Sequence, residues 1–196
     1  MGGDRPGLLE RETGLRRHKL DVAAYYRMAE VGILGPDDRV ELIEGEILDM
    51  APIGSAHGAT VDSLAEAVRA GLARRAIVRV QGPLRLSGES ELQPDLMLLR
   101  PREDRYRGSH PGPGDVLLLV EVADSTLRTD RTVELPLFAS QGIAEVWIVS
   151  LPEGIVEVHR GPQGEAWRST LRMGRGEVLE PEALPGLRIA VDDVLG

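Results

Sequence analysis

Residues 116–122 form a run that is apolar at every position except Glu121. The run has the length of a β-strand, and a strand has this composition when both faces of its sheet are covered. A strand with one face in water would instead alternate between apolar and polar residues. The run therefore predicts a central strand in a sheet with helices packed against it, which is an α/β fold.

The elements around this run follow a definite order. A helix is expected from about His57 to Arg75, with Ser55 as its cap, because apolar residues recur at helical spacing. These residues are Val61, Leu64, Ala65, Val68 and Leu72. Three strands follow at 77–86, 92–99 and 116–122, then a helix at 130–140 and a strand at 145–150. Gly82-Pro83 predicts a bulge or kink in the first strand, and Pro136 predicts a kink in the second helix.

Further elements are expected outside this core. A helix is expected at 20–31, and residues 40–50 are typical of a hairpin with Glu44-Gly45 as its turn. Residues 155–160 and 165–173 indicate a second hairpin across Gly161-Pro162. We expect residues 1–18 to be a flexible tail and 19–196 to be one domain. Its mixed central sheet would be extended, or covered at an edge, by the hairpins.

The composition narrows the possible functions. The chain has 196 residues and no cysteine, which excludes disulfides and thiolate chemistry. Aromatic residues make up 3%, too few to favour base stacking, and the net charge of −9 argues against a surface built to surround DNA. No apolar run reaches the ~18 residues that span a bilayer. A cytoplasmic protein without a membrane partner is expected.

Asp95 and Glu121 are the strongest candidates for chemistry. They lie on two successive predicted strands, so their side chains are expected to converge in one cleft. A carboxylate in so apolar a run costs several kcal/mol to bury unless it is paired, protonated or bound to metal. Two such acids could share a divalent cation, and oxygen ligands suit Mg²⁺ or Mn²⁺. The alternative is that one acid pairs with an arginine and the other lies at a strand end in solvent.

Two more residues could join such a site. His57 lies where a helix begins, and it could approach a metal or a phosphate; a capping or surface histidine fits the same position. Alternation along the first hairpin puts Glu41 on the face opposite Val40 and Leu42. An exposed strand acid is the alternative for Glu41.

Several linked motifs resemble the Uma2 family, of the PD-(D/E)xK restriction-endonuclease-like superfamily. They are ELIEGEILDMAPIGSAH, QPDLMLLR, LLLVEVADSTLRTDR and LPLFASQGIAEVWIVS, within about residues 20–160. The resemblance implies a core of helix, three strands, helix and strand, the order that the residues themselves predict. It also implies that Asp95 and Glu121 hold a divalent metal, and it matches His57 and Glu41 to family positions.

The chain departs from this superfamily at one position. In the superfamily a lysine positions the attacking water. The plain ExK spacing would place this lysine at position 123, which is Ala123 in this chain. Uma2-like chains supply it from the next helix in a DRxxK pattern, but this helix has Glu134 at that position. Lys19 is the only lysine in the chain. Three hypotheses follow: Glu134 is a further ligand or a base, Arg131 supplies the positive charge, or the site is chemically inactive.

The leading functional hypothesis is a metal-dependent DNA endonuclease that hydrolyses phosphodiester bonds. The alternative is a catalytically inactive nuclease-fold protein that acts in binding or assembly. A homodimer is also expected, because two subunits often cut two strands and the hairpins leave edges to cover.

Overall fold

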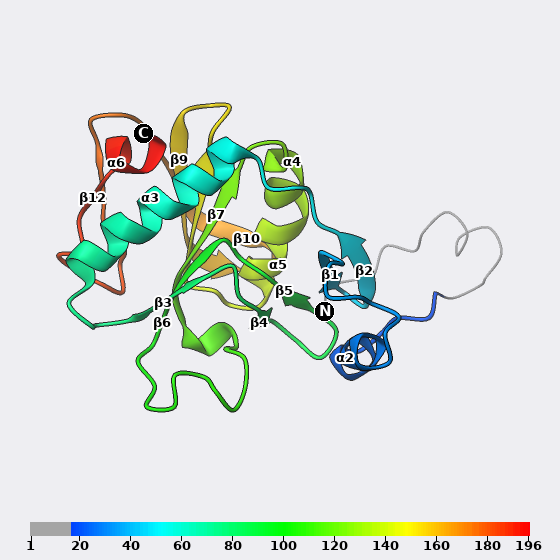
Figure 1. Ribbon diagram of the computed structural model, residues 1–196. Helices are drawn as coiled ribbons and strands as arrows, with labels where there is room; N and C mark the ends of the chain where they lie inside the picture. Colours follow the sequence, from blue (N-terminus) through cyan, green and yellow to red (C-terminus); the bar gives the residue numbers. More distant parts are fainter. Residues whose placement is uncertain (1–16) are drawn as a thin grey trace.

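The centre of the molecule is a six-stranded sheet with the order β10-β9-β8-β7-β6-β3. The computed structural model describes residues 17–196 (Figure 1), so most of the expected tail lies outside the described residues. Strand β7 (Val116–Ala123) is buried at all eight positions, as its sequence predicts. It pairs in parallel with β8 (Glu145–Ser150) and antiparallel with β6 (Leu96–Leu99), so the sheet is mixed as expected.

Antiparallel strands complete this sheet at both edges. Strand β3 (Ile77–Val80) pairs with β6, and β9 (Ile155–Gln163) and β10 (Ala166–Met173) extend the other side. The β9–β10 turn lies at Gly164-Glu165, because Gln163 is opposite Ala166; the prediction of a turn at Gly161-Pro162 is wrong. Gly161 takes a φ of +66° within β9, where the Arg168 side chain crosses it, and pairing continues past it.

A smaller sheet has the order β2-β1-β5-β4. Strands β1 (Val40–Ile43) and β2 (Glu46–Asp49) form the predicted hairpin, and β4 (Leu84–Arg85) and β5 (Glu91–Leu92) complete the sheet. Two segments that were each predicted as one strand are therefore split between the two sheets. Each split falls just before or at a proline, Pro83 and Pro94, which has no N–H to continue a ladder.

Helices cover both faces of the large sheet (Figure 1). Helix α3 (Ser55–Leu72) packs on one face with α6 (Val191–Leu195) and the short strands β11 (Val178–Leu179) and β12 (Ile189–Ala190). Gly54, not Ser55, is the N-cap of α3, and no side chain caps that end; Ser55 is already helical. Helix α2 (Val22–Glu30) and the 3₁₀ turn η1 (Pro113–Asp115) lie outside this arrangement.

The opposite face carries one helical segment made of three parts. These are α4 (Leu127–Thr129), the π-helical turn η2 (Asp130–Glu134) and α5 (Leu135–Ser140). Leu135 N–H donates to the Asp130 carbonyl, five residues back. Pro136 follows and cannot donate, so the predicted irregularity takes the form of a wide turn just before it. Across residues 17–196, no helix combines the length and the hydropathy needed to cross a membrane.

Candidate functional site

A pocket of about 530 Å³ opens between the small sheet, the start of α3 and the end of β7. Its lining includes seven acids, and the side chains of His57, Gln81 and Gln93 lie among them. The acids are Glu41, Asp49, Asp95, Glu121, Asp124, Asp130 and Glu134. Arg39 and His57 are the basic residues that line the pocket, counting only residues 17–196. Negative charge therefore exceeds positive charge in this pocket.

Asp95 and Glu121 lie side by side at the base of this pocket. Pairing of Leu96 with Val120 makes them neighbours on adjacent strands. The Asp95 N–H donates to Glu121 Oε2 at 3.2 Å, and the Val122 N–H donates to Asp95 Oδ2 at 2.9 Å. Each residue is only 9% exposed. The predicted convergence of these two carboxylates in one cleft is confirmed.

His57 reaches the same place from the first turn of α3. Its Nε2 lies 2.9 Å from Asp95 Oδ1, and Gln81 Nε2 donates to that oxygen at 3.3 Å. The hydrogen bond to Asp95 raises the pKa of His57 more than burial lowers it. His57 is therefore a pocket residue that carries a proton more readily than a free histidine, and the alternative of a capping or surface residue does not fit.

Further acids surround Glu121. Burial is the main cause that raises the pKa of Glu121 well above its ordinary value, and the charges of Glu134 and Asp95 raise it further. The pKa of Glu134 is raised in the same way, first by burial and then by Glu41 and Asp130. In this pocket the acids repel one another, which favours their protonated forms or the binding of a cation.

Glu41 is held in the pocket by the small sheet. Its Oε1 accepts a hydrogen bond from the Gln93 N–H at 2.7 Å. Burial raises its pKa more than this bond lowers it. The structure thus brings Glu41 to the site, and the alternative of an exposed strand acid does not describe its position.

Asp130 and Glu134 both face the pocket because they lie on the same side of the η2 turn. Asp130 is buried and accepts a hydrogen bond from Thr126 Oγ1 at 2.9 Å. Sequence reasoning did not single out Asp130 as a site residue. The available signal was its spacing, since residues four apart on a helix share a face.

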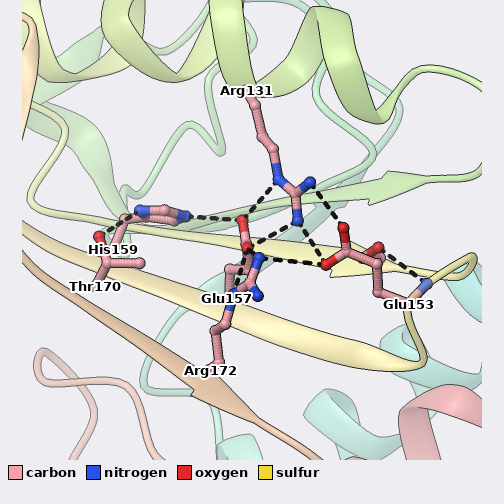
Figure 2. Close-up of polar contacts among 7 residues, drawn as sticks. Arg131, Glu153, Glu157, His159, Thr170 and Arg172 are labelled. Carbon is pink, nitrogen blue, oxygen red and sulfur yellow. Dashed lines mark hydrogen bonds and ion pairs between the residues drawn. The ribbon is translucent and has the colours of Figure 1, made fainter.

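Arg131 does not line the pocket. Its guanidinium binds Glu153 and Glu157 (Figure 2), with four N–O distances between 2.8 and 3.1 Å. The hypothesis that Arg131 supplies the missing positive charge is therefore wrong. The wide η2 turn directs Arg131 to the sheet while Asp130 and Glu134 face the pocket.

The acids are close but do not form a finished metal site. Among residues 17–196, no group of three or more His, Asp or Glu side chains has the spacing to hold a metal ion. The oxygens of Asp95 are occupied by His57, Gln81 and a backbone N–H. The donor chemistry suits a hard divalent cation, because carboxylate oxygens are its preferred ligands.

Comparison with known proteins assigns the chain to a family. The chain matches the Uma2 family model, described as "Putative restriction endonuclease", over residues 22–192. The chain belongs to the Uma2 family, which confirms the resemblance predicted from its motifs.

A crystal structure titled as that of a "putative nuclease belonging to DUF820" from Anabaena variabilis ATCC 29413 has a similar fold. The TM-score is 0.69 at 16% identity, with 90% of this chain and 97% of that chain covered. At this identity the similarity establishes the fold. A search of curated proteins found no match. Family and fold together point to a nuclease of the restriction-endonuclease type.

Proposed function

We propose that this protein is a metal-dependent nuclease that hydrolyses phosphodiester bonds in DNA. The observation that supports this most strongly is the convergence of Asp95, Glu121 and Glu134 with further acids in one pocket. Protein folds seldom retain such repulsion, and perturbed carboxyls in a cleft are typical of functional sites. A divalent cation offsets this repulsion, which is why the site suits Mg²⁺ or Mn²⁺.

In this proposal Asp95 and Glu121 hold the cation. When bound, the metal supplies an activated water and neutralises charge on a phosphoryl oxygen. His57 fixes one Asp95 oxygen through the 2.9 Å contact and can keep a proton there. Glu134, with its raised pKa, is able to hold or release a proton at a higher pH than an ordinary glutamate.

The pocket is lined by no lysine from residues 17–196, which supports a second candidate function, a nuclease-fold protein that binds without cutting. Lys19 does not line the pocket, and Arg39 donates instead to the Ala51 carbonyl at 3.2 Å. A phosphate in the pocket therefore meets mainly acids. Metal binding without cleavage would favour this second function.

Metal binding in the pocket should stabilise the folded protein. We expect millimolar Mn²⁺ to raise the melting temperature of the wild type, since a ligand present at 100 times its Kd stabilises by about 2.7 kcal/mol. Asp95→Asn should abolish most of this shift, because it removes a charge at the base of the pocket. Differential scanning calorimetry with and without chelator measures both.

Asp192→Asn serves as the matched control. Asp192 is an exposed acid on α6, where it binds Arg175 and the Gly176 N–H away from the pocket. It should respond to Mn²⁺ as the wild type does. Plasmid cleavage with Mn²⁺, with Asp95→Ala as the inactive reference, then tests hydrolysis. No thermal shift and no cleavage in the wild type would refute the proposed function.

A further inference from the structure

The β9–β10 hairpin contributes no residue to the pocket, but it contacts the helical segment α4–η2–α5, which contributes Asp130 and Glu134. In the first contact, the guanidinium of Arg131 on η2 binds Glu157 on β9 and Glu153 in the turn before it (Figure 2). Bidentate arginine–carboxylate pairs fix orientation as well as distance. Glu157 is buried, so this contact lies largely out of water, where the pair is less screened.

A second contact with the hairpin lies one turn further along the helical segment, at Leu135. Trp167 on β10 donates from Nε1 to the Leu135 carbonyl at 3.2 Å. His159 packs against Trp167 with ring centroids 5.9 Å apart, and its Nδ1 lies 3.0 Å from Thr170 Oγ1. The hairpin thus holds the helix backbone at 135 and a side chain at 131.

These two anchored positions alternate with the two that face the pocket. Arg131 follows Asp130 directly, and Leu135 follows Glu134 directly. The π-helix is rare and occurs mostly as single turns inside α-helices, frequently at functional sites. The contacts of Arg131 with Glu157 and of the Leu135 carbonyl with Trp167 hold this turn from outside the helix.

We propose that Arg131 is a positioning residue and that the β9–β10 hairpin is the outer support of the candidate site. By fixing η2 against the sheet, Arg131 keeps the carboxylates of Asp130 and Glu134 in the pocket beside Glu121. This inference rests on the proposed function for its link to metal binding. The anchoring itself is independent of any metal.

The chain contains a matched control for this idea. Arg172 on β10 binds the same two acids, Glu157 at 2.9 Å and Glu153 at 3.4 Å. It carries the same charge but contacts the network from the sheet side, not from η2. Arg131→Met and Arg172→Met therefore remove equal charge from one network, and only the first releases the helical turn.

The experiment compares these two variants with the wild type in two measurements. Hydrogen exchange without metal reports the opening of residues 129–135; we expect at least ~10-fold faster exchange there in Arg131→Met and little change in Arg172→Met. Calorimetric titration with Mn²⁺ should give about 10-fold weaker binding for Arg131→Met, the size usual for residues that orient ligands. Arg131→Lys should restore part of the exchange protection and part of the Mn²⁺ affinity, because lysine keeps the positive charge but cannot make the bidentate contact of the guanidinium.

The two measurements separate the possible failures. Equal exchange in the two methionine variants would overturn the anchoring role, whatever the metal does. Faster exchange with unchanged Mn²⁺ affinity would overturn the positioning role. A wild type that binds no Mn²⁺ would refute the proposed function, and the exchange comparison would still decide whether Arg131 anchors η2.

Discussion

Glu134→Lys should raise nuclease activity at least tenfold, or create it where the wild type has none. Glu134 lines the pocket beside Glu121 and adds negative charge where a phosphate would enter. The substitution removes that repulsion and adds a cation able to orient water and stabilise the transition state. A tenfold change corresponds to ~1.4 kcal/mol in the barrier, small for a change of two charge units near the reacting atoms.

Glu134→Gln separates the two effects of this substitution. It removes the negative charge without adding a positive one, so its activity should lie between those of the wild type and Glu134→Lys. The fold should survive both changes, because Lys, Gln and Glu have similar helix propensities. Supercoiled plasmid cleavage with Mn²⁺, and with chelator as the blank, measures all three proteins at matched concentration.

Other results would favour the other accounts of this position. If the wild type cuts well and both variants cut worse, Glu134 is a working ligand or base, consistent with its raised pKa. If all three are inert while Asp95 is still needed for Mn²⁺ binding, more than a lysine is missing. The binding function would then be the better account.

The central strand and the pair of acids could be predicted because local rules determine them. An apolar run with one carboxylate predicts β7, and the next strand back along the chain brings Asp95 beside Glu121. The passage between sheets at Pro83 and Pro94 could not be predicted. The sequence marks an interruption there, but which sheet the next residues join depends on distant partners such as Leu42, which pairs with Glu91.

The direction of Arg131 was unpredictable for a related reason. Regular α-helical spacing places Arg131 and Glu134 on roughly one side, and the π-helical turn moves them apart. Pro136 indicates an irregular helix but not its kind. The acids Glu153 and Glu157 that bind Arg131 lie more than 20 residues away. Pairing over such distances follows from the fold and leaves no local pattern.

Glu121→Gln should stabilise the metal-free protein at neutral and higher pH, by about 1–3 kcal/mol, because it removes an ionisable carboxyl that is buried among other acids. The pKa of Glu121 is raised in the folded state, so the folded protein retains a proton that the unfolded chain has already released. Its contribution to stability is complete below the ordinary glutamate value of 4.5 and is lost as pH rises through the folded pKa. The glutamine side chain does not titrate, so the part of the pH dependence that comes from Glu121 should disappear.

Urea unfolding in chelator at several pH values between 5 and 8 measures the difference between the two proteins. Groups elsewhere titrate equally in both, so the difference isolates Glu121 and the acids coupled to it. Glu145 on β8 is the matched control, because it is also buried but bound to Arg160 at 2.9 Å. Glu145→Gln should destabilise at every pH, since it leaves a partly buried arginine without its charge partner.

Millimolar Mn²⁺ should reverse the order of the two proteins. The wild type gains the free energy of metal binding, which Glu121→Gln forfeits, so the more stable protein in chelator becomes the less stable one with metal. This reversal distinguishes a cation site from a cluster of acids that is merely protonated. If Glu121→Gln destabilised the metal-free protein and Mn²⁺ left both unchanged, the carboxyl of Glu121 would be a structural hydrogen-bonding group. The repulsion in the pocket would then be relieved by protons alone.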